Sequence, residues 1–331
     1  MTATEITRIL DETHANFVLL LCHHNADPDA VCSAYAFQGL LAKHRPHITA
    51  EIGTGQGISR LSKHILEKIP ITVNLQPDVE KADVIVLLDT NTTQQVGLLA
   101  ERVMKTTAPI IVIDHHAAHP QTEQIAKLCI SDEEASSTCE IVYNLYKQLN
   151  MKLDLNVAKA LFLGITFDTR HFILANSSTF KTISELGDIG VNPQEVLTVL
   201  ALPMDFSERV ARIKACRRAK LLKVENWIIA LSHVSAYQAS AARALIDLGA
   251  HMAAVAGQKN GKIEMSLRCT REFNQITGIH LGKDIAKPLG EYLRGMGGGH
   301  ATAAGVNGEG QIDNGLKRCL RLVKEKLSNQ E

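Results

Sequence analysis

Three short runs of the chain are apolar with no polar alternation, at residues 17–22, 84–88 and 110–113. Strands that are buried on both faces of a parallel sheet have this pattern, because neither face meets water. The stretches around these runs have helical spacing of apolar residues, at 29–43, 57–69, 94–105, 137–149 and 157–167. Strands that alternate with helices predict a parallel α/β sheet.

The alternation begins again near residue 227. Strands are predicted at 227–231, 252–256 and 262–267, helices at 235–248, 282–293 and 312–328, and a turn at 295–300. A basic helix is predicted between the two blocks, at 206–223, and we interpret it as a solvated linker helix rather than a phosphate-attracting face. We therefore expect a two-domain α/β protein with domains at 1–190 and 225–331 and a helical linker at 191–224.

Composition narrows the class of protein. The 331 residues are 45% hydrophobic and 21% charged, which excludes a disordered or fibrous chain. The 35 Lys and Arg residues balance 35 Asp and Glu residues. Proteins that grip long duplex DNA through its phosphates are usually basic, so any nucleic-acid partner is expected to be short.

The seven cysteines include no CxxC pair and are odd in number. This pattern predicts reduced thiols rather than a disulfide framework or a zinc ribbon. The first residues lack the basic start and apolar core of a signal peptide, and no apolar run approaches the roughly 18 residues of a membrane span. We expect a cytoplasmic protein without membrane contact; its oligomeric state cannot be derived.

Acidic and imidazole side chains follow the predicted core elements of the first domain. His23, Asp27 and Asp29 follow the first strand, Asp89 follows the second, Asp114, His115 and His116 follow the third, and Asp168 ends the 157–167 helix. Ligands of open α/β sheets bind at the carboxyl ends of the strands, so these side chains are expected to meet there.

Six of these side chains are candidate metal ligands, namely His23, Asp27, Asp29, Asp89, His115 and Asp168. Four carboxylates crowd together only if cations neutralise them, and a mixed N/O set suits Mn²⁺, Mg²⁺ or Fe²⁺. Six ligands suit two ions about 3.5–4 Å apart that share one carboxylate. Each of these sequence segments alone could be a turn or a helix cap, but four such segments at the ends of predicted strands and helices favour a metal site.

A second candidate site lies near the C-terminus. Gly297, Gly298 and Gly299 precede His300, and glycines let backbone N–H groups approach an anion closely. Arg268 is the expected cationic companion, whereas the alternative is a flexible turn. The glycines at 53–57 could suggest a dinucleotide loop, but Ile58 breaks the GxGxxG spacing, so we reject it.

These motifs resemble those of the DHH phosphoesterase superfamily. The resemblance is carried by His23-x-x-x-Asp27-x-Asp29, Asp89, Asp114-His115-His116 and Asp168, and by a glycine-rich segment, Gly297 to His300, that is similar to the motif of DHHA1 domains. Within this superfamily, the chain most resembles the short NrnA-like subgroup, the nanoRNase/pAp-phosphatase type. The resemblance implies a DHH catalytic domain, a DHHA1 substrate-binding domain and an active site in the cleft between them.

The resemblance also implies a role for each residue. His23 and Asp27 would hold one Mn²⁺, Asp29, His115 and Asp168 a second, and Asp89 would bridge both, with Mg²⁺ or another divalent ion as alternatives. His116 would lie close to the scissile phosphate, with Asp114 orienting the histidines. Arg268 and His300 would hold a substrate phosphate or terminal nucleotide. The chain departs from the family at Arg170 and His171, where relatives often have glycine, and at Cys269, where a serine is common.

The implied activity is two-metal hydrolysis of phosphate esters, in which the ions activate a water that attacks phosphorus. The expected substrates are short RNA or DNA oligonucleotides and pAp-like nucleotides, since 4% aromatic residues and zero net charge disfavour a long single-strand track. The alternatives are a cyclic-dinucleotide phosphodiesterase, a RecJ-like exonuclease, an inorganic pyrophosphatase and a non-catalytic nucleotide sensor.

Overall fold

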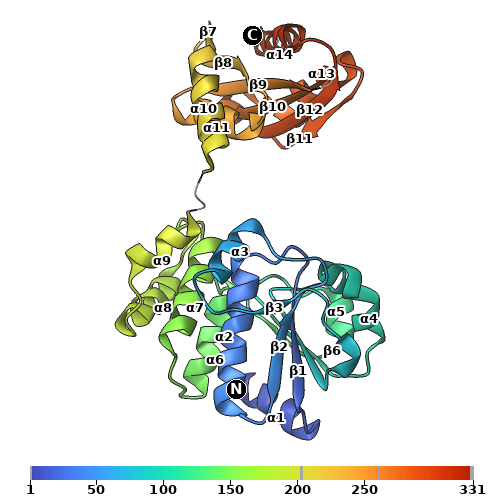
Figure 1. Cartoon of the computed structure of the whole chain (residues 1–331), viewed down its shortest axis with the longest axis vertical. Helices are drawn as coiled ribbons and strands as arrows, with labels where there is room; N and C mark the ends of the chain where they lie inside the picture. Colours follow the sequence, from blue (N-terminus) through green and yellow to red (C-terminus); the bar gives the residue numbers. More distant parts are fainter. Residues whose placement is uncertain (1, 202–203, 260, 329–331) are drawn as a thin grey trace. The chain divides into compact units, whose positions relative to one another are not determined.

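The chain divides into two units, Met1–Leu202 and Pro203–Glu331, and each is built around its own six-stranded sheet (Figure 1). The computed structural model describes residues 2–201, 204–259 and 261–328. Within that part of the chain, no helix is both long and apolar enough to cross a membrane. The predicted fold class, two α/β domains with a parallel sheet in the first, is confirmed.

The sheet of the first unit is parallel throughout, in the order β3-β2-β1-β4-β5-β6. Its strands are β1 (Phe17–Cys22), β2 (Thr49–Gly53), β3 (Val73–Asn74), β4 (Val84–Leu88), β5 (Ile110–Asp114) and β6 (Ala126–Ser131). The chain passes from β1 to β2 on one side and later places β4 on the other side. This reversal makes the carboxyl ends of β1 and β4 the switch point of the sheet, where open α/β folds bind ligands.

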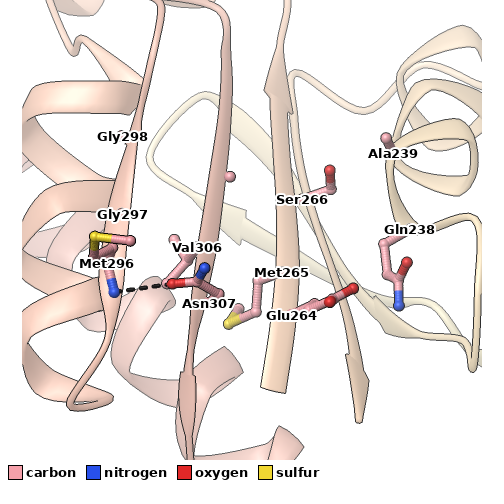
Figure 2. Close-up of a pocket in the computed structure, with 11 residues that line it drawn as sticks. Gln238, Ala239, Glu264, Met265, Ser266, Met296, Gly297, Gly298, Val306 and Asn307 are labelled. Carbon is pink, nitrogen blue, oxygen red and sulfur yellow. Dashed lines mark hydrogen bonds between the residues drawn. The ribbon is translucent and has the colours of Figure 1, made fainter. Parts of the chain in front are cut away.

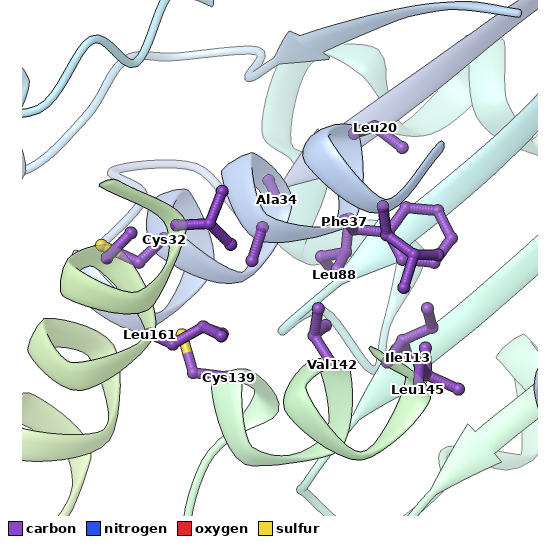
Figure 3. Packing of buried hydrophobic residues seen from close by; sticks show 14 of the residues in the cluster. Leu20, Cys32, Ala34, Phe37, Leu88, Ile113, Cys139, Val142, Leu145 and Leu161 are labelled. Atoms are coloured by element: carbon purple, nitrogen blue, oxygen red, sulfur yellow. The ribbon is translucent and has the colours of Figure 1, made fainter. Parts of the chain in front are cut away.

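Helices cover both faces of this sheet. The helices are α1 (Thr2–Glu12), α2 (Pro28–His44), α3 (Arg60–Leu66), α4 (Ala100–Lys105), α5 (Pro120–Ile125), α6 (Thr138–Gln148), α7 (Leu155–Asp168), α8 (Ser177–Asp188) and α9 (Pro193–Leu200). The larger core lies between the sheet and α1, α2, α6 and α7, and Figure 3 shows Phe37, Val142 and Leu161 packed within it. Side chains of α4 and the preceding 3₁₀ segment, Thr93–Leu99, cover the other face.

The second unit holds a mixed sheet in the order β11-β12-β10-β9-β8-β7, in which only β8 and β9 are parallel. Its strands are β7 (Lys220–Val224), β8 (Trp227–His233), β9 (Met252–Lys259), β10 (Lys262–Cys269), β11 (Met296–Gly299) and β12 (Ala303–Glu309). Its helices are α10 (Phe206–Arg218), α11 (Gln238–Asp247), α12 (Arg271–Thr277), α13 (Lys287–Tyr292) and α14 (Ile312–Ser328), with a π-helical turn at Leu281–Ala286.

The two faces of this second sheet are covered unequally. One face packs against a core that includes residues of α12, α14 and the π-helical turn. On the other face, the described core residues come from α10, α11, β8, β9 and adjoining loops, and none comes from β10, β11 or β12. The half of the sheet formed by these three strands therefore has one face without a hydrophobic core over it.

Two sequence predictions were wrong in the second unit. The basic helix predicted over 206–223 ends at Arg218, and Lys220–Val224 is strand β7, which pairs antiparallel with β8. The predicted turn at 295–300 contains strand β11, paired with β12. Within the expected linker range 191–224, the structure has α9, α10 and β7, while residues 202 and 203 lie outside the described part.

Candidate metal centre

The carboxyl ends of β1, β4 and β5 bring the predicted site residues of the first unit together. Three groups of potential ligand atoms occur, each within 4.8 Å of one another: His23, Asp27 and Asp89; Asp29, Asp89, His115 and Asp168; and Asp89, Asp114, His115 and His116. Every candidate ligand predicted from the sequence belongs to at least one of these groups. Asp89 belongs to all three, so it stands at the centre of the cluster.

Asp89 turns its two oxygens toward different partners. Its Oδ2 lies 3.8 Å from His23 Nε2, and its Oδ1 lies 3.7 Å from His115 Nε2. Thr138 Oγ1 donates a hydrogen bond of 3.1 Å to the same Oδ1. The carboxylate therefore faces a histidine on each side, which is the arrangement of a ligand shared by two neighbouring ions.

The turn between β1 and α2 positions His23 and Asp27. Asp27 caps α2, and its Oδ1 accepts from the backbone N–H groups of Asp29 and Ala30 at 3.0 and 3.2 Å. His23 Nδ1 lies 2.9 Å from the carbonyl oxygen of His24, which leaves Nε2 facing the carboxylates. The glycine loop after β2 supports this turn, since Thr54 Oγ1 donates to the His23 carbonyl at 3.1 Å.

The start of α6 holds Asp29. This carboxylate is fully buried, and its oxygens accept from the backbone N–H of Thr138 at 2.7 Å and of Cys139 at 3.1 Å. A helix N-terminus stabilises a negative charge because its first N–H groups have no helical partner. Thr138 and Cys139 thus orient Asp29, and Thr138 also orients Asp89.

Asp114 lies next to Asp89 and is paired with His116. Its Oδ1 lies 2.7 Å from His116 Nδ1 and accepts from the His116 backbone N–H at 2.9 Å. Asp114 is buried, whereas the His116 side chain is 55% exposed. The pair therefore presents the far nitrogen of His116 to solvent next to the cluster.

The crowding of charges shifts the pKa of several groups. Burial, together with the carboxylates of Asp27 and Asp114, raises the pKa of Asp89 to about 7. Burial also raises the pKa of Asp29 well above its usual range, helped by Asp168. Burial lowers the pKa of His23, but its carboxylate neighbours outweigh that effect and raise it to about 9. The four carboxylates of the cluster therefore have too few positive charges around them, so the site favours the binding of cations.

The residues present fit divalent metal ions. The N···O separations of 3.7–3.8 Å around Asp89 are too long for hydrogen bonds, yet they suit two ligands of one ion at about 2.0–2.2 Å from each. His115 Nε2 is buried and faces two carboxylates, with Asp168 Oδ2 at 2.9 Å and Asp89 Oδ1 at 3.7 Å. A buried ring nitrogen that faces carboxylates can serve as a metal ligand.

The predicted anion site of the second unit is spread over β10 and the β11–β12 hairpin. Arg268 is half-buried, and its cross-strand partner on β12 is Ala303. The backbone N–H of His300 donates to the Ala303 carbonyl at 2.7 Å, which places the hairpin beside this arginine. Burial and the nearby Arg243 lower the pKa of Arg268, as expected where cationic side chains gather.

The segment after Asp168 has an unusual backbone. Arg170, His171 and Phe172 have φ values of 51°, 58° and 69°, so three successive residues other than glycine adopt the left-handed region. Such residues cost about 1–3 kcal/mol each and concentrate at functional sites. Phe172 anchors the segment, since its ring packs edge-on against Phe162 at 6.1 Å. The residue types do not predict this conformation, because none of the three residues is glycine.

Comparison with known proteins agrees with this geometry. The DHH family N-terminal domain matches residues 17–165, and the DHHA1 domain matches residues 225–329. The uncharacterized protein MJ0988 of Methanocaldococcus jannaschii is 36% identical over 90% of this chain and 89% of its own length. A Streptococcus mutans protein named "Probable bifunctional oligoribonuclease and PAP phosphatase NrnA" is 27% identical over 90% of this chain and 91% of its own.

Two further similarities extend this picture. The cyclic-di-AMP phosphodiesterase GdpP of Geobacillus thermodenitrificans is 25% identical over 87% of this chain, which spans 44% of that relative. The crystal structure of an exopolyphosphatase-related protein from Bacteroides fragilis has the same fold, with a TM-score of 0.65, 20% identity and coverage of 100% of this chain and 98% of its own. The chain therefore belongs to the DHH phosphoesterase family, with a DHHA1 domain in its C-terminal part.

Proposed function

We propose that this protein is a Mn²⁺-dependent phosphodiesterase that hydrolyses short oligonucleotides and pAp-like nucleotides. The observation that carries the proposal is the position of Asp89, which faces a histidine with each of its carboxylate oxygens. The full-length similarity to the NrnA protein of Streptococcus mutans supports the substrate class. The mixed histidine and carboxylate set supports Mn²⁺, which accepts both nitrogen and oxygen ligands.

In this proposal, two groups of side chains hold one ion each. His23 and Asp27 belong to the first group, Asp29, His115 and Asp168 to the second, and Asp89 serves both. Bound there, divalent ions would supply Lewis-acid catalysis and activate a water for attack on phosphorus. The N-terminus of α6 keeps Asp29 and Asp89 fixed, so the ligands need little reorganisation.

The remaining residues act on the substrate. His116 lies beside the cluster, and Asp114 holds its Nδ1, so its other nitrogen is free to contact the scissile phosphate or the leaving oxygen. We assign Arg268, the glycines Gly297–Gly299 and His300 to binding of a substrate phosphate remote from the scissile one. A half-buried cation next to a glycine-rich backbone suits this task.

A substrate panel with added Mn²⁺ tests the proposal. The panel holds di- to pentaribonucleotides, pAp, cyclic di-AMP, pyrophosphate and long single-stranded DNA. We expect turnover of the short oligonucleotides and pAp, and its loss in excess EDTA. Faster turnover of cyclic di-AMP would assign the chain to the activity named for GdpP instead. Full activity in EDTA would contradict a metal-dependent mechanism.

The assignment of the second unit has its own test. Arg268→Ala and His300→Ala should keep the metal content of the wild type, because neither residue belongs to the cluster. They should lose about 10²-fold in kcat/KM on oligonucleotides and pAp, a typical effect of losing a positioning contact. The loss should be smaller on an aryl phosphodiester, which has no remote phosphate. Loss of bound metal in either variant would place the residue among the ligands.

A further inference from the structure

The face of β10, β11 and β12 that lacks a hydrophobic core contains a pocket of about 430 Å³ (Figure 2). Its floor is formed by β10, β12 and β11, and the start of α11 forms one wall. This volume falls within the roughly 300–1,000 Å³ that small-molecule sites occupy. The pocket lies entirely within the second unit, and none of its lining residues is among the predicted metal ligands.

The register of the strands arranges the floor in rows, because cross-strand partners point to the same face of a sheet. One row consists of Glu264, Asn307 and Met296, and the next consists of Ser266, Gly305 and Gly298. The following position along β10 is Arg268, opposite Ala303. The floor therefore has a carboxylate and an amide at one end, small residues in the middle and a cation beyond them.

The middle row has no side chains at its two glycines, and packing does not require their absence. A Cβ atom built on Gly298 would meet nothing within 4 Å, and one built on Gly305 would only reach the Met265 carbonyl at 4.0 Å. Neither glycine has a positive φ, so the backbone does not require glycine there. The absence of side chains leaves a flat backbone surface on which a planar ring can lie.

The carboxylate end of the pocket offers unused hydrogen-bonding groups. The Glu264 side chain is exposed and makes no hydrogen bond or ion pair with the described residues, and Figure 2 shows it turned toward Gln238 across the pocket. Asn307 Oδ1 accepts from the Met296 backbone N–H at 3.0 Å, which leaves its NH₂ group free to donate. A carboxylate repels phosphate, so this end suits N–H donors of a ligand.

The two ends match the polarity of a nucleotide. Glu264 and Arg268 are four residues apart on one strand and face the same side, which separates them by about 13 Å. A nucleotide likewise has its phosphate at one end and the N–H groups of its base at the other. A phosphate near Arg268 would let the base lie over Gly305 and Gly298, with its polar edge at Glu264.

We propose that this pocket binds the terminal nucleobase of the substrate and that Glu264 makes it select guanine. This inference rests on the proposed function, in which Arg268 binds the phosphate of the same nucleotide. Guanine offers two adjacent donors, N1–H and the 2-amino group, which match the two oxygens of a carboxylate. Adenine and cytosine place a ring acceptor beside their amino group, and uracil flanks its single N–H with two carbonyl oxygens, so each repels one carboxylate oxygen.

Base preference in turnover tests the inference. Wild-type protein with Mn²⁺ should hydrolyse pGpG with a kcat/KM about tenfold above that for pUpU, with pApA between them. Glu264→Gln should bring this ratio close to one, mainly by slowing pGpG, because an amide offers a donor where guanine needs an acceptor. Glu309→Gln is the matched control, since Glu309 lies further along β12 and outside the pocket. It should keep the wild-type ratio.

A second variant tests the hollow floor. Gly305→Val fills the pocket with a residue that strands accommodate well, so the fold should persist. It should reduce kcat/KM on pGpG by tenfold or more and leave an aryl phosphodiester unaffected. An unchanged pGpG rate in this variant, or a base ratio that Glu264→Gln does not alter, would overturn the inference.

Binding without turnover separates this inference from the proposed function. GMP should bind wild-type protein in EDTA more tightly than UMP does, and Glu264→Gln should abolish the difference, as measured by calorimetry. If no substrate is hydrolysed but this difference is found, the proposed activity fails and the guanine pocket stands. If dinucleotides are hydrolysed with Mn²⁺ but GMP and UMP bind equally, the activity stands and the guanine pocket fails.

Discussion

Asp89 combines a central position in the cluster with a left-handed backbone. Its φ is 53°, a value that asparagine and aspartate tolerate better than other residues with a side chain. Its position after an apolar strand identified it in the sequence as a candidate ligand. The hydrogen bond from Thr138 was not predictable, because it joins residues 49 positions apart through packing of α6 on the sheet.

Asp89→Asn removes the charge of this side chain and keeps its shape. Asparagine keeps the left-handed conformation but removes the negative charge between the two histidines. We expect kcat to fall by about 10²-fold or more, because both ions lose a charged ligand. Retention of more than about a tenth of the wild-type kcat would contradict the assignment of Asp89 as a shared ligand.

The same substitution should lower the activity without lowering the stability of the metal-free protein. Burial and, secondly, the neighbouring carboxylates raise the pKa of wild-type Asp89 to about 7, so neutralising this side chain should not destabilise the metal-free protein at pH 8. We expect the Tm in EDTA to equal or exceed that of the wild type, while the rise of Tm on adding Mn²⁺ should shrink. Thermal melts with and without metal measure both effects.

At the scale of elements, burial decided which strands could be predicted. β1, β4 and β5 are buried along nearly their whole length, so their apolar runs are continuous. β6 at the sheet edge is only partly buried, and its sequence AKLCIS carries no clear pattern. β7 also lies at an edge, and its two lysines match the basic helix before it, so the pattern predicts a helix where the structure has a strand. β11 is almost all glycine and has no pattern to detect.

Gly164 in α7 links helix packing to the cluster. A Cβ atom at this position would overlap the Cys139 sulfur and approach Asp29 Oδ1 to 2.8 Å. Gly164→Ala should therefore displace α6 or Asp29, with a loss of about 1–3 kcal/mol in the free energy of unfolding and weaker metal binding. Chemical denaturation and metal titration measure these changes.

Gly187→Ala is the matched control for this variant. Gly187 lies in α8, and a Cβ atom there meets nothing within 4 Å. The substitution should leave metal binding unchanged and stabilise the helix slightly, because alanine has a higher helix propensity than glycine. Equal effects of the two substitutions would show that α7 does not need its glycine for close packing.

At the scale of the whole molecule, the two units differ in what a metal ion can stabilise. The described clusters of potential ligands lie in the first unit, while the second has its own separate hydrophobic cores. The cluster could be predicted from the sequence because most of its side chains follow predicted strands, and parallel strands end at one edge of a sheet. The pocket on the second sheet was not predictable, since its rows depend on the pairing of β10, β12 and β11.

Hydrogen exchange should locate the effect of metal. Mn²⁺ should slow exchange of the Thr138 and Cys139 amides, which donate to Asp29, because fixing this carboxylate strengthens both bonds. The amides of β8 and β9, in the core of the second unit, should be unchanged. Equal protection in both units would mean that the ion binds elsewhere or stabilises the chain as a whole.

The stabilisation of the protein by metal should increase with pH. In the metal-free protein, the pKa of His23 is raised from 6.5 to about 9 and that of Asp89 from 3.8 to about 7. The folded state therefore binds more protons than the unfolded state between pH 6 and 9, so these groups make the metal-free protein less stable as pH rises through this range. Metal binding requires both groups without their protons, so Mn²⁺ affinity should rise over the same range.

The increase in Tm caused by a fixed Mn²⁺ concentration should consequently be larger at pH 8.5 than at pH 6.5, and calorimetry in buffers of different ionisation enthalpy should detect proton release on binding. A metal-induced increase that is equal at both pH values, without proton release, would show that His23 and Asp89 do not bind the ion.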